Sequence, residues 1–449
     1  MRKGKPEIIF SLIFGILSKF FAYFLLLVFA NLYSQEELGA ALFILSIFNL
    51  TLNLSSLGMP FIYVSWLIKK KDIYSVFSFL LILNIIIFLV ALAFSASHPW
   101  IFPLALILPL VYLFNTSISI LNSKYQYHLS KLFSSLIVLF CILFAFLLRN
   151  LERLGITASY SISYIIITSI VIFLTRKKLF NILSNLTLNL TSLTEYLKKS
   201  IFVSLLTVSF TILYWSDSII LGLLSTFENV AKYNIAGHMS NIITIIPISL
   251  SLFLLNRSAE YSTPEHQKWS FGVLNRNLRL SFAFTITLAI TLSSLLTLLT
   301  KIFFPKYIGI EPFVMLLSIG LIFFSIYHLI YMYLAGKLHP EKAFFPIATA
   351  AILNIILDII LIPIAGIYGI VIATLTAHML AFTWLTLKMG LLRKYSPIYI
   401  LILLIPLSYI LKAYGLILLI IIIPLLFYFK LIEKEDITVI INTLRRKSK

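Results

Sequence analysis

The sequence predicts an all-α polytopic membrane protein with about 14 transmembrane helices, arranged as two six-helix lobes related by a parallel internal repeat, plus two C-terminal helices. Three observations predict this class. Of the 449 residues, 61% are hydrophobic and only 11% are charged, whereas globular proteins carry roughly 25% charged residues. Long apolar runs alternate with short polar loops, and the basic residues concentrate in every second loop.

The apolar runs approach the length of about 20 residues that crosses a hydrocarbon core of about 30 Å. A multi-pass protein of the cell (plasma) membrane is therefore expected. The expected spans are Ile8–Leu32, Leu38–Trp66, Ser75–Phe94, Trp100–Leu121, Leu132–Leu148, Tyr160–Leu174, Ser200–Leu224, Val230–Leu255, Leu280–Thr300, Phe313–Leu334, Phe344–Pro363, Ile367–Leu387, Ile398–Leu411 and Ala413–Phe429.

The net charge of +19 reflects membrane topology rather than nucleic-acid binding. Lys and Arg accumulate in cytoplasmic loops of membrane proteins. With alternate loops inside, roughly 28 of the 35 basic residues are cytoplasmic, and both termini are inside. The opposite loops keep only Arg149, Arg153, Lys232, Lys301, Lys306 and Lys412.

The loops suggest a division of the chain into lobes. A linker with basic ends separates spans six and seven, and it has leucines at every third or fourth position, as in an amphipathic surface helix: Leu179, Leu183, Leu186 and Leu190. The expected divisions are an N-lobe (1–178), a cytoplasmic amphipathic linker (179–199), a C-lobe (200–390), spans 13 and 14 (391–430) and a cytoplasmic tail (431–449).

A short repeated segment supports the two lobes. "LYSQEELGAALF" begins at Leu32, and a similar "LLSTFENVAKYN" begins at Leu223, about 191 residues later. This alignment places Ser34 on Ser225 and Glu37 on Glu228. Because six spans separate the copies, both have the same orientation, which predicts a parallel repeat of the kind that transporters use.

Enzymatic and metal chemistry find no support in the sequence. The single cysteine, Cys141, lies in an apolar run, and no pair of the seven histidines has metal-ligand spacing such as H-x-x-x-H. The loops are too short for a soluble catalytic domain, and no P-loop motif for ATP is present. We therefore expect neither an enzyme, nor a metal site, nor a cofactor.

Four segments resemble a known family. They are "LYSQEELGAALFILSIFNLTLNLSSLGMPFIYVSWLIKKK", "WSDSIILGLLSTFENVAKYNIAGHM", "FFPKYIGIEPFVMLLSIG" and "AILNIILDIILIPIAGIYGIVIATLTA". Over about Ile8 to Leu387 they are similar to the polysaccharide transporter and lipid-linked oligosaccharide flippase family of the multidrug/oligosaccharidyl-lipid/polysaccharide (MOP) export superfamily.

The resemblance implies a function. Members of this family move glycans linked to polyprenyl (pyro)phosphate from the cytoplasmic to the outer leaflet by alternating access. It implies the lipid-linked glycan and the bilayer as partners, with a glycan polymerase or glycosyltransferases as further candidates. A monomeric chain is expected. Relatives of the family flip the peptidoglycan lipid precursor or expel drugs.

Ionisable residues inside predicted spans are candidate substrate-binding groups, because a charge in hydrocarbon usually faces a wet cavity or a partner. Lys19, near the middle of span one, is expected to attract an anionic phosphate or acidic sugar, with a structural ion pair or a snorkelling side chain as the alternative. Tyr23, one turn away, could stack on a sugar ring or simply pack. Asp217 in span seven is expected either to couple a cation or bind sugar hydroxyls, or to form a structural interhelical bond.

The other candidates are weaker. Asn53, one turn from Asn49, could line a sugar path, although interhelical bonding is the better interpretation. Asp358 occupies a position where relatives commonly carry Asn, and a structural bond to a neighbouring helix is expected. His328 and His378 are expected to pack, with proton transfer as the alternative.

Two rival functions stay open. A drug/cation antiporter resembling the MATE (multidrug and toxic compound extrusion) type needs carboxylates that exchange Na⁺ or H⁺, and Asp217 opposed by Lys19 suits it poorly. A non-transporting scaffold of a glycan-assembly complex predicts that the charges in the spans are dispensable.

Overall fold

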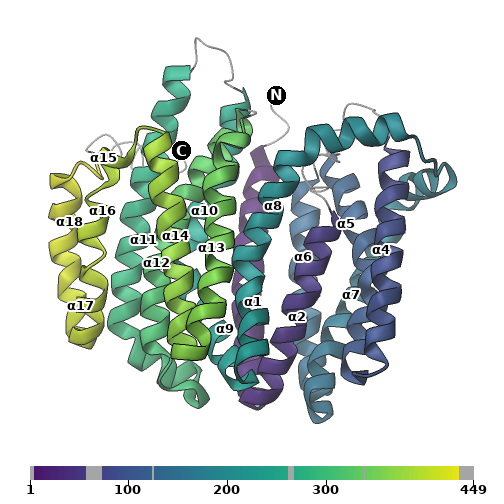
Figure 1. Cartoon of the computed structure of the whole chain (residues 1–449), viewed down its shortest axis with the longest axis horizontal. Helices are drawn as coiled ribbons and strands as arrows, with labels where there is room; N and C mark the ends of the chain where they lie inside the picture. Colours follow the sequence, from purple (N-terminus) through teal and green to yellow (C-terminus); the bar gives the residue numbers. More distant parts are fainter. Residues whose placement is uncertain (1–4, 57–72, 124–125, 261–266, 338, 434–449) are drawn as a thin grey trace. The chain divides into compact units, whose positions relative to one another are not determined.

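The computed structural model describes residues 5–56, 73–123, 126–260, 267–337 and 339–433, and over these residues every regular element is a helix (Figure 1). This confirms the predicted fold class, since a helix is the element that satisfies its own backbone in hydrocarbon. The first part of the chain forms α1 (Lys5–Leu32), α2 (Gln35–Ser56), α4 (Tyr74–Ser95), η1 (Pro99–Ile101), α5 (Phe102–Ser123), α6 (Tyr127–Leu147), η2 (Arg149–Leu151), α7 (Glu152–Ser184) and α8 (Leu190–Leu224). The rest forms α9 (Phe227–Asn241), η3 (Ile242–Thr244), α10 (Ile245–Glu260), α11 (Gln267–Phe303), η5 (Pro305–Tyr307), α12 (Glu311–Gly336), α13 (Glu341–Ala365), α14 (Ile367–Lys388), α15 (Leu392–Tyr395), α16 (Ile398–Leu401), α17 (Leu404–Leu411), η6 (Lys412–Ile417) and α18 (Leu418–Tyr428).

Eleven helices among the described residues are long and apolar enough to cross a membrane. The apolar part of α1, Phe20–Leu32, is shorter than a full span. The expected span Val230–Leu255 is divided between α9 and α10 by the 3₁₀ turn η3. Pro247 explains this break, because it has no N–H to donate to the carbonyl four residues earlier. The chain is therefore a multi-pass membrane protein.

The chain forms two compact units, Met1–Lys232 and Tyr233–Lys449. In the first unit, α1 packs against α6, α5 against α7, and α2 along α8. In the second, α14 packs against both α12 and α13, and α10 and α11 pack against α12. The expected lobe boundaries at residues 178, 199 and 390 stay predictions.

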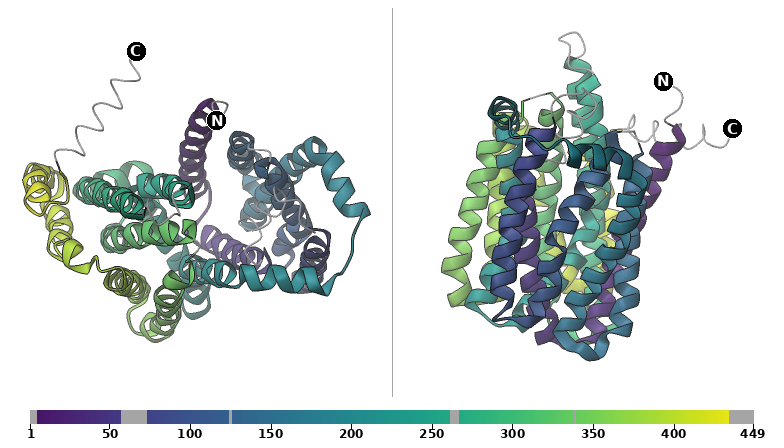
Figure 2. Two further views of the ribbon diagram at one scale, coloured as in Figure 1. Left: turned by 90° about the horizontal axis from the view of Figure 1, so that it is seen from above. Right: turned by 90° about the vertical axis from the view of Figure 1, so that its right-hand side faces the viewer.

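The expected linker helix is interrupted. α7 continues to Ser184 and α8 begins at Leu190, where the side chain of Asn189 caps the helix by accepting hydrogen bonds from the backbone N–H groups of Thr191 (2.9 Å) and Ser192 (3.4 Å). Asn189 therefore starts a new helix where leucine spacing alone predicts a continuous one. The first part of α8 runs across one end of its unit before the helix turns along the bundle (Figure 2).

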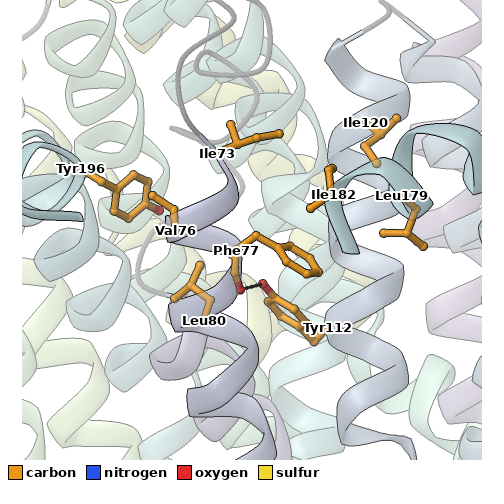
Figure 3. Close-up of a cluster of buried hydrophobic side chains, with 9 residues drawn as sticks. All are labelled: Ile73, Val76, Phe77, Leu80, Tyr112, Ile120, Leu179, Ile182 and Tyr196. Carbon is orange, nitrogen blue, oxygen red and sulfur yellow. Dashed lines mark hydrogen bonds between the residues drawn. The ribbon is translucent and has the colours of Figure 1, made fainter. Parts of the chain in front are cut away.

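An apolar cluster fastens this segment to the first unit (Figure 3). It joins residues from α4, α5, α7 and α8, together with Ile73 just before α4. Within it, the buried hydroxyl of Tyr112 donates a hydrogen bond to the carbonyl of Phe77 at 3.0 Å. Leu179 and Tyr196 are buried here, whereas Leu190 is 75% exposed. The four leucines of the linker therefore do not form one face.

The repeated segment recurs in structure with a register that differs by one residue from the sequence alignment. α1 ends at Leu32 and α8 at Leu224, while α2 begins at Gln35 and α9 at Phe227, a separation of 192 residues in both cases. In the first copy, Ser34 and Glu37 form a capping box: the backbone N–H of Ser34 donates to Glu37 Oε2 (2.8 Å), and that of Glu37 donates to Ser34 Oγ (3.2 Å).

The second copy uses Thr226 in the place of Ser34. The Thr226 hydroxyl accepts a hydrogen bond from the backbone N–H of Asn229 at 3.3 Å. Ser34 therefore corresponds to Thr226, and the alignment with Ser225 is wrong by one residue. Sequence matching favoured the shared Ser and Glu letters, whereas the structure aligns the capping positions.

Two further turns repeat, and neither was recognised in the sequence. A 3₁₀ turn that begins with proline joins α4 to α5 at Pro99 and α11 to α12 at Pro305. The residues before these prolines have similar φ angles, −135° at His98 and −133° at Phe304. The turn between α6 and α7 has φ 51° and ψ −134° at Glu152, and the turn between α13 and α14 has φ 55° and ψ −127° at Gly366. All three turns expected on the outer side of the first lobe thus recur in the second.

The described residues after α14 form a hairpin, and its turn has the same backbone geometry as the turns at Glu152 and Gly366. Lys412 has φ 52° and ψ −135°, and an added Cβ on Gly415, three residues later, would meet the carbonyl oxygen of Ser408 at 2.5 Å. In a continuous helix, residues seven apart lie about 10 Å apart along the axis. The chain therefore reverses between Ser408 and Gly415, so α17 and α18 run side by side (Figure 1).

Candidate functional site

The two candidates on α1 differ in what the structure describes. Lys19 lies within the backbone of α1, 13 residues before its end, but its side chain is outside the described residues. Tyr23 lies nine residues before the end of α1 and is half-buried. At 1.5 Å per residue these positions are about 20 Å and 14 Å from the predicted outer end. The role expected for Lys19 stays a prediction.

Asp217 is buried inside the first unit. It lies seven residues before the end of α8, about 10 Å from the predicted outer end, and is 1% exposed. Ser216 and Ser218 beside it are also buried. The hydroxyl of Ser216 donates to the carbonyl of Ile212 at 2.7 Å, so this serine is satisfied by its own helix. A carboxylate in this position is held among helices rather than in open solvent.

Asn53 does not reach the level of Asp217. The ring of Phe43 on α2 lies against Gly222 on α8, and these helices are antiparallel. This register places Asp217 level with Phe48, so Asn53 is five residues, or about 7 Å, farther along α2. Asn49 is the amide nearest that level. The side-chain N–H groups of Asn49 and Asn53 donate to the carbonyls of Leu45 (2.7 Å) and Asn49 (2.8 Å).

Asp358 in the second unit is paired on its own helix. It is 0% exposed, and Asn354, one turn earlier on α13, donates a hydrogen bond from Nδ2 to Asp358 Oδ2 at 3.3 Å. Asn354 is also fully buried, and its Oδ1 accepts no hydrogen bond from any described residue. A buried carboxylate beside an unused amide oxygen offers oxygen ligands of the type that hard cations prefer.

Other polar groups of the second unit lie at two matching depths. Asp358 and Thr374 are each seven residues, about 10 Å, from the turn between α13 and α14, while Asn354 and His378 are each 11 residues, about 16 Å, from it. The hydroxyls of Thr374 and of Tyr233 on α9 lie 3.3 Å apart.

A second polar contact lies one turn deeper. Nδ1 of His378 and the hydroxyl of Tyr327 on α12 lie 3.0 Å apart. The second unit thus has a buried polar layer, which we define as Tyr233, Tyr327, Asn354, Asp358, Thr374 and His378. Of these, the sequence identified only Asp358 as a candidate substrate-binding residue. The signal that could have found more is the shared spacing of four residues in Asn354/Asp358 and Thr374/His378, which places each pair on one helical face.

Two buried tyrosines lie outside the spans. Burial raises the pKa of the Tyr196 hydroxyl and also that of the Tyr307 hydroxyl, so both stay neutral at physiological pH. Among the residues that the structure describes, no three His, Cys, Asp or Glu side chains converge as a metal cluster would require.

Comparison with solved structures assigns the fold. The chain is similar to a structure described as lipid II flippase MurJ in an inward closed conformation, with 19% identity, a TM-score of 0.73, and coverage of 95% of this chain and 100% of that chain. It is also similar to an inward-facing multidrug resistance MATE family transporter of the MOP superfamily, with 13% identity, a TM-score of 0.60, and coverage of 87% and 99%. A MATE structure in complex with MaL6 gives 12% identity, a TM-score of 0.60, and coverage of 86% and 97%.

Sequence comparison adds little. No family model matches the chain. A segment of 170 residues, 37% of this chain, is 29% identical to the uncharacterized membrane protein MJ1068 of Methanocaldococcus jannaschii, and the match spans 33% of that protein. The resemblance to the MOP superfamily is thus confirmed at the level of the fold, which the chain shares with MurJ and MATE structures.

Proposed function

We propose that this protein is a membrane transporter that moves a lipid-linked oligosaccharide from the cytoplasmic to the outer leaflet by alternating access. The observation that carries the proposal is the likeness to the lipid II flippase structure over 95% of the chain, with a TM-score of 0.73 against 0.60 for the two MATE structures. The match covers 95% of this chain, against 86% and 87% for the two MATE structures.

The proposed cargo has an anionic, hydrophilic headgroup and a polyprenyl tail. In this mechanism the headgroup crosses through a hydrated cavity while the tail stays in lipid. Lys19 attracts the phosphate, because a cation in a low-dielectric cavity interacts more strongly with an anion than it does in water. Tyr23 offers an aromatic face to a sugar ring.

Asn53, Asp217 and Asp358 complete the proposed set of polar groups. Asn53 offers an amide to sugar hydroxyls, and Asp217 either binds hydroxyls or couples a cation. Asp358, with the unused Oδ1 of Asn354, fits cation coupling better than sugar binding, because both residues are fully buried in the second unit. Transport is driven by an ion gradient, the membrane potential or consumption of the cargo.

Several topological features belong to the same proposal. Both termini lie in the cytoplasm, and the protein resides in the plasma membrane as a monomer. Glycan polymerases or glycosyltransferases are candidate partners, because they produce or consume the cargo at the two membrane surfaces.

Complementation of a flippase-deficient glycan strain tests the proposal. Wild type is expected to restore surface glycan, and Lys19→Ala to leave lipid-linked oligosaccharide trapped inside at normal membrane abundance of the protein. Lys19→Arg is the matched control, because it keeps the positive charge, and it is expected to retain most of the activity.

The outcome separates the rival functions. Restored glycan with wild type, Lys19→Ala and Asp217→Ala alike would assign the charges a structural role. Failure of wild type to restore glycan, together with raised drug resistance of the host, would favour the antiporter. The likeness to the MATE structures, at a TM-score of 0.60, supports this alternative.

A further inference from the structure

His378 lies in a cradle formed by one face of α12. Its Nδ1 is 3.0 Å from the Tyr327 hydroxyl, and the rings of Phe324 and His378 are 5.6 Å apart between centroids. An added Cβ on Gly320 would lie 3.4 Å from Cδ2 of the imidazole ring. Gly320, Phe324 and Tyr327 are spaced by four and three residues, so they lie on the same side of the helix.

His378 is buried, with a slightly larger exposed fraction than three of its polar neighbours. Tyr327, Asn354 and Asp358 are 0% exposed, whereas His378 is 5% exposed. Of these four side chains, His378 is the one that is not completely buried.

We propose that His378 is a proton-binding site whose protonation reverses the hydrogen bond between α12 and α14. In the neutral ring with its proton on Nε2, Nδ1 accepts the hydrogen bond from the Tyr327 hydroxyl. Uptake of one proton from water places an N–H at Nδ1 as well, so the ring becomes a donor and the Tyr327 oxygen must accept. The tyrosine O–H then turns to another acceptor.

The helices packed against α14 determine which ionisable groups lie near a protonated His378. α14 packs against α12, α13 and α15. The titratable groups on the helices packed against α14 are Glu311, Tyr327, His328, Tyr331 and Tyr333 on α12, Glu341, Lys342 and Asp358 on α13, and Arg393, Lys394 and Tyr395 on α15. Tyr233 on α9 contacts Thr374, and α14 itself also carries Tyr368 and Lys388. Phe324 separates His328 from His378, with its ring stacked on His328 at 5.3 Å.

Asp358 is the buried carboxylate of α13, and it lies one helical turn nearer than His378 to the turn between α13 and α14. The exposed basic residues of α13 and α15 lie at the other end of these helices, away from that turn. The imidazolium is therefore drawn toward the α13 side of the layer. The consequence of this inference rests on the proposed transport function. In that function, a proton gradient would shift the packing of α12 against α14 in the second unit. The chemical step itself requires no glycan.

A fluorine label on α14 tests the inference with the full-length protein in phospholipid nanodiscs. Met379 is adjacent to His378 and 40% exposed, so Met379→Cys accepts a trifluoromethyl label, while the native Cys141 is fully buried. The ¹⁹F spectrum is expected to change with pH between two states in the labelled protein. His378→Gln is expected to abolish this dependence.

Two further variants keep the test decisive. Tyr327→Phe removes the donor that favours the neutral ring, and it is expected to move the midpoint upward by about one pH unit. His98→Gln is the control, because His98 is an exposed histidine in the first unit, and it is expected to change nothing. A pH dependence that persists in His378→Gln, an unchanged midpoint in Tyr327→Phe, or no pH dependence in the labelled parent between pH 4.5 and 8.5 would overturn the inference.

The result is independent of the cargo. A pH-dependent spectrum in a protein that fails to flip any lipid-linked glycan would retain the proton site and reject the proposed function. Flipping by a protein whose spectrum does not change with pH would reject the proton site and retain the proposed function.

Discussion

Gly39 on α2 lies directly against the backbone of Phe227, the first residue of α9, so that an added Cβ would overlap the Phe227 carbonyl oxygen. Next to this contact, Phe43 packs on Gly222 and on the ring of Phe227, whose centroid is 5.6 Å away. The two repeated caps therefore cross with no side chain between them. This contact fixes the register of α2 along α8, which places Asp217 relative to the amides of α2.

Substitution of Gly39 tests this crossing. We expect Gly39→Ala to lower stability by about 1–3 kcal/mol, because overpacking forces the backbone apart. Gly237 on α9 is the control, since nothing lies within 4 Å of its added Cβ. Gly237→Ala should be neutral or stabilising by up to about 1 kcal/mol. Thermal unfolding followed by size-exclusion fluorescence measures both, and equal effects would contradict the crossing.

The strained turn at Lys412 predicts a stabilising substitution. Lys412 has φ 52°, a backbone region that disfavours side chains with a Cβ, whereas Gly366 occupies the corresponding turn between α13 and α14. We expect Lys412→Gly to raise stability by about 1 kcal/mol, and Gly366→Ala to lower it by a similar amount. Melting temperatures of the purified variants check both signs. Destabilisation by Lys412→Gly would contradict the assigned turn.

The capping box predicts unequal effects at the two repeats. Ser34 takes part in reciprocal hydrogen bonds with Glu37, whereas the Thr226 hydroxyl accepts one hydrogen bond from Asn229. Ser34→Ala is expected to cost about 1–2 kcal/mol and Thr226→Ala about 0.5–1 kcal/mol. Ser225→Ala separates the two registers. A loss at Ser225 larger than at Thr226 would restore the original alignment.

The pair of Asn354 and Asp358 predicts a separation of stability from transport. Asp358→Asn removes a buried charge while keeping the side-chain shape, so stability is expected to hold or rise. Flipping is expected to fall about tenfold or more if the charge couples a cation. Asn354→Leu removes the hydrogen-bond donor to Asp358 and should lower stability by about 1–3 kcal/mol. Normal flipping by Asp358→Asn would assign this residue a structural role alone.

The sequence predicted the architecture well because hydrophobic length and loop charge act locally. The C-terminal hairpin followed from two apolar runs separated by Lys412, and its turn was found there. The predicted register of the repeat was wrong by one residue. The sequence alignment paired identical residues, whereas the structure pairs the residues that cap the helices. Leucine periodicity predicted an amphipathic linker helix, and it gave no sign that the side chain of Asn189 caps a new helix.

The candidate site was predicted less completely. Asp217 and Asp358 stood out because charges inside apolar runs are rare. The contacts between Tyr327 and His378 and between Tyr233 and Thr374 join residues 51 and 141 positions apart, so no local pattern reveals them. The proposed roles of all five candidates remain predictions: Lys19, Tyr23, Asn53, Asp217 and Asp358.

The most direct test of the central claim is a flipping assay in proteoliposomes that contain the purified protein and a fluorescent polyprenyl-pyrophosphate oligosaccharide. The fraction of labelled lipid that an external, membrane-impermeant reagent can reach is measured over time. We predict that wild type raises this fraction from about half to nearly all of the label, and that Lys19→Ala slows the change. A fraction that stays at about half with correctly folded wild-type protein, at several pH values and with an imposed membrane potential, would contradict the account.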